Sequence, residues 1–404
     1  MQGHREKAQN VVIVGGGFGG LYTALALAQR KNHPPVLLIE PNDRFLFSPL
    51  LYELLSGELR GWEIAPRYDG LLAGRGLAWL QDRVERIDSH NHQLHTAAGR
   101  TLPYGRLVIA TGAQSNTFAV PGAGQHSLGF RSLADVERLQ RLVALLKSQR
   151  RPLQRIAVVG AGPTGVELAC KLADMAEGSA VIELIEQGPQ VLPQARSFNR
   201  EQAALALQRR DVRLRTRTQV EAVEAEAITL RCQPEGDSPA HSETLAVRAV
   251  VWTAGLSFRS PPIDPAPACD SRGRLLCGPD LRLTGHGDLF VAGDLAAPVD
   301  PDGAAGEAPG VAPPATAQVA FQQASVLATN LIRSLRGEPL EPFQWNDLGE
   351  MISLGVGEAS LTAAGVTLAG PAAYQLRRLA YLTRLPGRPH QLRVAAGWLA
   401  DWTP

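Results

Sequence analysis

Near the start of the chain stands Val11-Val12-Ile13-Val14-Gly15-Gly16-Gly17-Phe18-Gly19-Gly20, a short apolar run that leads directly into a cluster of glycines. Continuously apolar runs of this length are typical of buried parallel strands. Apolar residues at helical spacing follow, and Val36 to Glu40 has the composition of the next strand. The stretch therefore predicts a βαβ unit with a glycine-rich first turn.

The same pattern returns in the middle of the chain. The apolar run 156–159 leads into Gly160-Ala161-Gly162-Pro163-Thr164-Gly165, then a predicted helix and the strand Val181 to Glu186. Glycines at this spacing allow a tight turn, close approach to a pyrophosphate and helix–strand packing. The sequence thus predicts two dinucleotide sites, built on Gly15, Gly17, Gly20 and on Gly160, Gly162, Gly165.

An acidic residue ends the second strand of each unit. Glu40 lies 20 residues after Gly20, and Glu186 lies 21 after Gly165. A carboxylate here accepts hydrogen bonds from ribose hydroxyls, although a solvated strand-end acid would look the same. Glu186 would repel a 2′-phosphate, so we expect NADH to be preferred over NADPH, with the neutral Gln187 softening that preference.

The composition of the chain limits the classes of protein to which it can belong. A chain of 404 residues with a net charge of +1 is large enough for two or more domains and does not favour nucleic acid as a partner. Its four cysteines show no paired or metal-ligand spacing, so we expect no metal site, no redox disulfide and a structural role for Cys170. We also expect surface loops without chemistry at 233–244 and 298–314.

No membrane-spanning segment is expected. The first ten residues lack the apolar stretch of a secretory signal, and nowhere do about 18 apolar residues run together. The protein is therefore expected to be soluble or to lie on a membrane surface.

Three further segments resemble the two-dinucleotide flavoprotein superfamily: Leu107 to Gly112, Val250 to Gly255, and Thr284 to Asp294. The resemblance implies an α/β fold of two Rossmann-like, doubly wound domains, the second inserted in the first. It implies FAD in the first unit and NAD(P)H in the second, with hydride passing to the flavin. The residues implied beside FAD are Ala110, Thr111, Gly112 and Asp294, and those beside NAD(P)H are Ala254 and Gly255.

A narrower resemblance is to the type II NAD(P)H:quinone oxidoreductases, single-subunit enzymes that reduce membrane quinone without pumping protons. Four segments carry it: Phe45 to Gly57, Gly162 to Glu167, Ala317 to Gln323, and Phe343 to Gly349, which looks like a strand followed by a turn. In addition, Arg384-Leu385-Pro386-Gly387 resembles the ending of a branch that acts on demethylphylloquinone in vitamin K1 synthesis.

This resemblance implies three catalytic residues. Glu167 would relay protons, because quinone reduction consumes two of them, although a structural glutamate in a helix first turn is an alternative. Gln318 and Gln322 would line the quinone site, since neutral amides can hydrogen-bond a carbonyl without the desolvation cost of an ion. Alternatively, Gln318 contacts only FAD.

The end of the chain carries an apolar stripe at helical spacing, formed by Leu392, Ala395, Leu399 and Trp402, and a set of arginines expected to face lipid headgroups: Arg377, Arg384 and Arg388. We expect a membrane-facing helix; a dimer interface or core packing is the alternative. Gly370 to Tyr374 stands where many relatives place a lysine and a tryptophan, so that role is not transferred.

Together these observations predict an FAD-binding domain in two parts (8–125 and 256–340), an NAD(P)H-binding domain (126–255) and a C-terminal membrane-association or dimerisation region (341–404). We expect a homodimer, peripheral on the cytoplasmic side of a membrane, with a quinone as substrate. Two rival functions remain: a soluble NADH reductase of a small electron-transfer protein, and a flavin-based NADH redox sensor.

Overall fold

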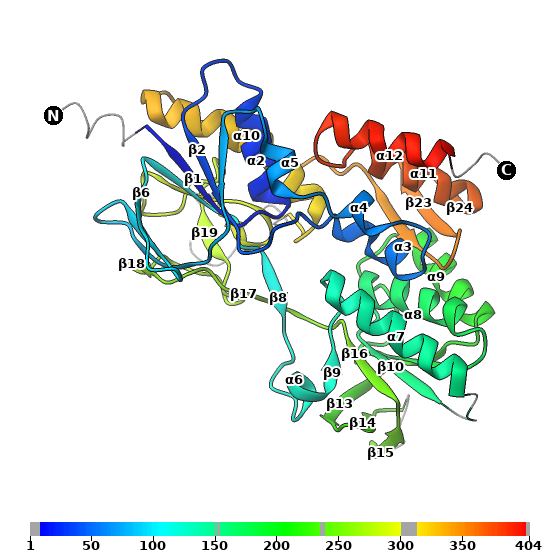
Figure 1. Ribbon diagram of the computed structural model, residues 1–404. Coiled ribbons are helices and arrows are strands. Elements are labelled where there is room, and N and C mark those ends of the chain that lie inside the picture. Colours follow the sequence, from blue (N-terminus) through cyan, green and yellow to red (C-terminus); the bar gives the residue numbers. More distant parts are fainter. Residues whose placement is uncertain (1–8, 150, 152–153, 235–238, 300–312, 401–404) are drawn as a thin grey trace.

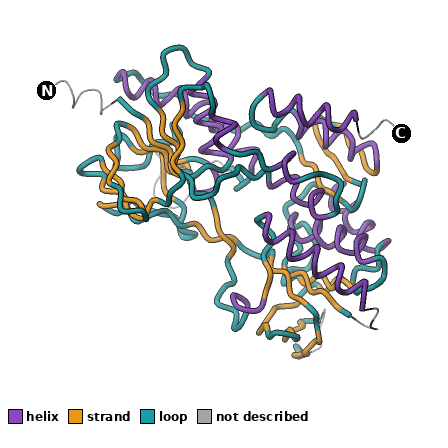
Figure 2. Tube along the Cα trace, in the orientation of Figure 1, coloured by secondary structure: helices purple, strands orange, loops and turns teal. Residues whose placement is uncertain are grey.

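The computed structural model describes residues 9–149, 151, 154–234, 239–299 and 313–400. Two α/β lobes are joined by a narrow connection, and a small C-terminal unit lies against both (Figure 1). Figure 2 shows helices gathered along one side of the second lobe and strands along the other.

The first lobe is built on a parallel five-stranded sheet in the order β20-β7-β1-β2-β3. Its strands are β1 (Val11–Val14), β2 (Val36–Ile39), β3 (Leu77–Leu80), β7 (Arg106–Ile109) and β20 (Leu289–Val291). Strand β20 returns to this sheet after the whole second lobe, which confirms the predicted insertion. Helices α2 (Phe18–Ala28) and α10 (Ala317–Arg336) pack against each other beside the sheet.

The second lobe has its own parallel sheet, in the order β12-β11-β10-β16-β9. These strands are β9 (Ser127–Leu128), β10 (Arg155–Val159), β11 (Val181–Ile185), β12 (Arg213–Arg215) and β16 (Ala249–Trp252). Helices α7 (Leu133–Gln149), α8 (Pro163–Ala176) and α9 (Ser197–Arg209) cover one face.

The other face of this sheet is covered by an antiparallel meander instead of helices. Its strands are β13 (Thr218–Val223), β14 (Ala227–Cys232) and β15 (His241–Ala246). Along β10, Ile156 and Val158 pack in the helical core, whereas Ala157 and Val159 pack in the core under the meander. The Rossmann-like prediction is confirmed, with strands in place of the helices that a strictly doubly wound lobe would have on this face.

The connection between the lobes is a two-stranded antiparallel ribbon of β8 (Ala113–Ser115) and β17 (Leu256–Phe258). The C-terminal unit contains β22 (Glu350–Ser353), β23 (Ala359–Ala363) and β24 (Val366–Gly370), followed by α11 (Pro371–Leu382) and α12 (Arg388–Ala400). The smaller elements are η1 (Ser48–Leu50), α3 (Leu51–Leu55), α4 (Gly61–Ile64), α5 (Tyr68–Leu72), β4 (Val84–Asp88), β5 (Gln93–Thr96), β6 (Thr101–Pro103), α6 (Ala123–His126), β18 (Ile263–Asp264), β19 (Leu275–Cys277), η2 (Gly293–Leu295) and β21 (Ala296–Pro298).

Two sequence expectations about loops and strands were wrong. Residues 343–349 are irregular rather than a strand and turn; the backbone N–H of Phe343 donates to the carbonyl of Pro279 at 2.7 Å, and the strand begins only at Glu350. The expected loop at 233–244 ends in strand β15, because His241 to Thr244 pair with β14 although they are polar. Most of the expected loop at 298–314 lies outside the described residues.

Candidate active site

The first glycine turn leaves room for a diphosphate. Gly15 has φ +99°, and a Cβ there would lie 2.4 Å from the carbonyl oxygen of Ala110; one at Gly20 would lie 1.8 Å from the oxygen of Gly15. A Cβ at Gly17, by contrast, would meet nothing within 4 Å. Two glycines thus allow the backbone to fold tightly, and the third opens onto space at the amino end of α2, where phosphate oxygens are favoured.

The second turn repeats this geometry. Gly160 has φ +98° and packs on Ala254, whose Cα would lie 2.9 Å from an added Cβ, and a Cβ at Gly165 would lie 1.8 Å from the oxygen of Gly160. Gly162 again opens onto free space. Gly255, with φ +72°, lies under the ring of Phe118. The residues present therefore fit a dinucleotide in each lobe.

Both strand-end acids are fixed to their glycine turns. Glu40 accepts a hydrogen bond from the backbone N–H of Gly16 at 2.7 Å and is 8% exposed, so it is not a solvated acid. Glu186 accepts from the N–H of Ala161 at 2.8 Å and from that of Gly188 at 2.7 Å. Each carboxylate thus lies at the carboxyl end of its strand and beside its turn, where a ribose would lie.

The other residues expected near FAD come from neighbouring strands of the first sheet. Ala110 to Gly112 follow β7, and Asp294 lies in η2 directly after β20, which pairs with β7. Burial raises the pKa of Asp294 above its ordinary value, although Arg131 opposes this. The pairing brings these predicted residues to one edge of the sheet.

The three glutamines at the start of α10 have different surroundings. Gln318 is half-buried in the first turn of the helix. Both amide atoms of Gln322 bond to the backbone of Asn346, at 2.8 and 3.0 Å, so binding a quinone would require this contact to break. The sequence analysis did not identify Gln323, which is buried and accepts from the N–H of Gly293 at 2.7 Å, in the segment Thr284 to Asp294. Its helical spacing from the buried Ala320 and Leu327 places it on the buried face.

Glu167 lies at the centre of a buried polar cluster. Its Oε1 accepts from the backbone N–H of Ser353 at 2.7 Å, and its carboxyl group also hydrogen-bonds Tyr52. Burial raises the pKa of Glu167 to about 7, against the lowering effects of Arg377 and of the Ser353 bond. A carboxyl group with this pKa exchanges a proton near neutral pH.

Arg377 completes this cluster, and the expectation that it faces lipid headgroups was wrong. Its side chain is 1% exposed, forms an ion pair with Glu53 and lies 3.7 Å from Oε1 of Glu167. It also donates to the carbonyl of Pro49 at 2.7 Å. Two buried carboxylates require a nearby cation, which explains why the arginine turns inward. The sequence signal was its helical spacing from the buried Tyr374.

An apolar, aromatic region adjoins the polar cluster. The guanidinium carbon of Arg377 lies 4.9 Å from the centre of the Tyr381 ring, which in turn packs edge-on against Phe47 at 5.6 Å. Further rings continue from there toward the first glycine turn and the start of α10: Phe45, Phe18, Tyr22 and Phe321. The protonatable carboxyl group of Glu167 thus lies close to a group of packed aromatic side chains.

The thiol of Cys170 behaves as expected of a structural residue. It is fully buried in α8, and burial raises its pKa to about 12. A thiol with this pKa is not a nucleophile near neutral pH.

Comparisons with known proteins agree with this geometry. The family model for pyridine nucleotide-disulphide oxidoreductases matches residues 9–324. The chain is 38% identical to a Synechocystis protein named demethylphylloquinone reductase NdbB, over 97% of both chains. It is 34% identical to an Arabidopsis thaliana alternative NAD(P)H-ubiquinone oxidoreductase, over 98% of this chain and 81% of the other.

The fold also matches a solved structure of NDH2 from Plasmodium falciparum in complex with NADH. The TM-score is 0.84 with 18% identity, covering 98% of this chain and 99% of the other. FAD and a nicotinamide dinucleotide are the cofactors of the family, and the two glycine turns fit them. The chain belongs to the type II NAD(P)H:quinone oxidoreductases, within the pyridine nucleotide-disulphide oxidoreductase family.

Proposed function

We propose that this protein oxidises NAD(P)H at the second lobe and reduces a membrane quinone beside the Glu167 cluster. The observation that carries the proposal is this cluster itself. It joins α8 of the nucleotide lobe, the segment Pro49 to Glu53 of the first lobe and α11 of the C-terminal unit around one carboxyl group. A two-electron quinone reduction needs a proton donor next to an apolar site, and a protonatable carboxyl group beside packed aromatic side chains supports this assignment.

The chain contributes binding, orientation and protons to the reaction. Bound FAD would supply the two-electron chemistry, and Ala110 to Gly112, Asp294 and Gln318 would contact it. Glu40 and Glu186 would hold the two riboses. Glu167, protonated near neutral pH, would give its proton toward the quinone, and Arg377 would then hold the carboxylate in place. Gln318 is the better of the two proposed glutamine ligands for the quinone carbonyl, because both amide atoms of Gln322 already bond to the backbone of Asn346.

The quinone class we propose is a naphthoquinone, with demethylphylloquinone as the specific candidate. The support is the 38% identity to the protein named for that substrate, together with the place of the Arg384 to Gly387 segment. The hydroxyl of Tyr22 donates to the carbonyl of Arg384, which ties this segment to α2 and to the aromatic region. The segment is therefore positioned to shape the quinone entrance.

The C-terminal helices are proposed to lie on the cytoplasmic surface of a membrane. Four of their leucines have large exposed fractions: Leu376 (48%), Leu379 (55%), Leu392 (71%) and Leu399 (69%). Helix α12 still packs inward through Val394, so the predicted stripe lies on its outer side, while Trp402 is outside the described residues. Among the described residues, no helix is long and apolar enough to cross a membrane. Exposed leucines flanked by arginines are typical of an interfacial helix.

The function is tested by anaerobic stopped-flow absorbance. NADH should bleach the flavin, and mixing with a short-chain naphthoquinone should restore it faster than mixing with a benzoquinone of equal tail length. Glu167→Gln should slow the second step and leave the first unchanged; Glu201→Gln, at an exposed glutamate of α9, is the matched control. Bleaching without recovery with either quinone would favour a protein acceptor or a sensor.

The membrane proposal is tested by co-sedimentation with vesicles that contain anionic lipid. Leu392→Ser with Leu399→Ser should reduce the bound fraction, whereas Leu205→Ser, an exposed leucine on α9, should not. If the double variant instead changes a dimer into a monomer without changing vesicle binding, the stripe is a dimer interface.

A further inference from the structure

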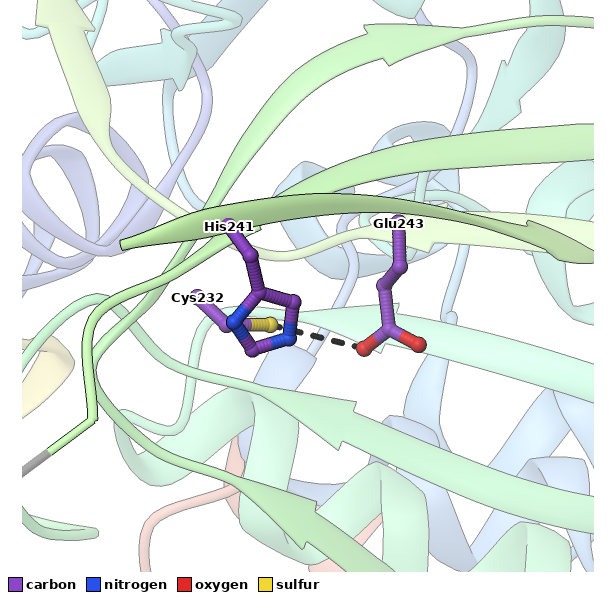
Figure 3. A group of neighbouring side chains, drawn as sticks. All are labelled: Cys232, His241 and Glu243. Atoms are coloured by element: carbon purple, nitrogen blue, oxygen red, sulfur yellow. Dashed lines mark hydrogen bonds between the residues drawn. The ribbon is translucent and has the colours of Figure 1, made fainter. Parts of the chain in front are cut away.

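The meander of the second lobe brings together three side chains that the sequence keeps apart. Cys232 ends β14, and its strand partner across the ladder is His241, the first residue of β15. Glu243 lies two residues further along β15 and therefore points to the same face. In Figure 3 the imidazole of His241 overlaps the thiol of Cys232, and the carboxylate of Glu243 lies beside them, hydrogen-bonded to the thiol. The spacing of the cysteines gave no sign of this cluster, because strand pairing creates it.

One pair of the donor atoms has the separation that a tetrahedral ion requires, and the third donor lies close by. One ligand atom from each side chain lies within 4.8 Å of the others, and Sγ of Cys232 is 3.4 Å from Oε1 of Glu243. Zn–S and Zn–O bonds of about 2.3 and 2.0 Å at a tetrahedral angle place sulfur and oxygen about 3.5 Å apart. The sulfur–oxygen pair is thus already at coordination distance, and a ring nitrogen of His241, on an exposed side chain, lies within 4.8 Å of both atoms.

We propose that Cys232, His241 and Glu243 bind a zinc ion, with a water molecule as the fourth ligand. A thiolate, an imidazole and a carboxylate form a donor set that suits Zn²⁺ and excludes Ca²⁺ and Mg²⁺, which take oxygen ligands. On binding, the Cys232 thiol loses its proton to solvent and a Zn–S bond forms, without any change of oxidation state.

Arg215 contacts this cluster and does not prevent binding. Its Nη1 lies 2.6 Å from Oε1 of Glu243, while its Nε lies 2.7 Å from Oε2 of the buried Glu183. Because Oε1 of Glu243 is also the oxygen near Sγ of Cys232, a metal bound there would require Nη1 of Arg215 to move to the other carboxylate oxygen, while its Nε keeps the bond to Glu183. Ligating carboxylates commonly have such a second hydrogen-bond partner, which fixes their orientation.

The site would act on the stability of the meander and not on electron transfer. It links β14 to β15 on the face of the second sheet opposite to α8, the helix that carries Glu167 (Figure 1). An ion bound only by the native hairpin stabilises the folded lobe by mass action. The inference is thus independent of the proposed quinone activity.

Cobalt substitution tests the site directly. The metal-depleted holoenzyme is titrated with Co²⁺, and a near-ultraviolet absorption from thiolate-to-cobalt charge transfer is expected in the wild type. Cys232→Ser should abolish it and His241→Ala should weaken affinity at least about tenfold. Cys269→Ser, at an exposed cysteine outside the cluster, is the matched control and should leave the band unchanged.

A second measurement guards against a misfolded variant. Zn²⁺ should raise the thermal midpoint of the wild type and not that of His241→Ala, whose exposed side chain can be removed without opening a core. No cobalt band, a band that survives Cys232→Ser, or an equal zinc shift in both proteins would overturn the proposal.

Discussion

Helices α2 and α8 follow equivalent glycine turns but have different surroundings. Seven residues after the first glycine, α2 carries Tyr22 and α8 carries Glu167. Both side chains bond to the C-terminal region: Tyr22 donates to the carbonyl of Arg384, and Glu167 accepts from the N–H of Ser353. Helix α2 contains no charged residue, whereas α8 buries both Glu167 and Lys171.

The difference lies in what each helix packs against. Lys171 of α8 forms an ion pair with Glu58, and Asp174 accepts from the N–H of Val356 at 2.7 Å, so the helix is bonded to both of its neighbouring units. Each buried charge needs such a partner. The same nucleotide-binding motif thus gives an apolar packing helix in the first lobe. In the second lobe it gives a helix whose charged side chains bond to both neighbouring units.

The largest expected effect is on cofactor binding, and it distinguishes the two glycine turns. In Gly20→Ala the new Cβ would lie 1.8 Å from a backbone oxygen, so nearly all bound flavin should be lost. Gly165→Ala creates the same 1.8 Å clash in the other lobe and should keep the flavin while NADH no longer bleaches it. Absorbance of the purified variants measures both, and Gly70→Ala, where the new Cβ meets nothing within 4 Å, is the control. Equal flavin loss in the two variants would show that the lobes are not independent.

The contrast between α2 and α8 also explains which parts of the two sites could be predicted from the sequence. Each glycine turn is encoded within about 30 consecutive residues, as expected for a βαβ unit, so strand, turn, helix and acid were all found by pattern. Glu167 was found by the resemblance of Gly162 to Glu167 to the family's second glycine motif, in which a glutamate follows the last glycine.

The partners of Glu167 could not be found in this way. Arg377 is separated from Glu53 by 324 positions, and its helix also exposes leucines, so a surface arginine was the natural reading. The cluster of Cys232, His241 and Glu243 was missed for a similar reason, since polar residues on both faces of an edge strand look like a loop.

Replacing Arg377, the cation of the Glu167 cluster, should weaken the contact between α8 and the C-terminal unit. Arg377→Met leaves Glu53 and Glu167 buried without their counter-charge, and breaking such a pair costs about 3–5 kcal/mol of unfolding free energy. Urea unfolding measures the loss, and Arg393→Met, at an exposed position of α12, should stay close to wild type. If both variants lost the same unfolding free energy, the buried ion pair would contribute no more to stability than an exposed arginine does.

The pH dependence of flavin reoxidation should report the ionisation of Glu167, the carboxyl group that α8 carries where α2 carries Tyr22. Because the folded pKa of Glu167 is about 7, raised from an ordinary 4.5, the group is protonated below that value and loses its proton above it. Flavin reoxidation by quinone should therefore fall about tenfold per pH unit above pH 7, while reduction by NADH stays flat. In Glu167→Gln the reoxidation rate should be low and independent of pH.

The same titration has a consequence for stability. A carboxyl group whose folded pKa is raised contributes stability that is complete below pH 4.5 and is lost as pH rises through 7. Wild type should thus lose stability relative to Glu167→Gln across this window, as measured by the difference in urea midpoint. If the urea midpoints of wild type and Glu167→Gln changed in parallel with pH, the pKa of Glu167 would be the same in the folded and unfolded states.

The smallest effect concerns the two strand-end acids. Glu186 is held beside the second turn by Ala161 and Gly188, where its charge would face a 2′-phosphate. Glu186→Gln keeps the shape and removes the repulsion, so the preference for NADH over NADPH should fall roughly threefold to tenfold, the range for solvent-screened charges. The ratio of kcat/KM values for the two cofactors measures this. Glu40→Gln, the matching change in the first lobe, should leave the ratio unchanged even where it weakens flavin retention, because its carboxylate would face the other dinucleotide.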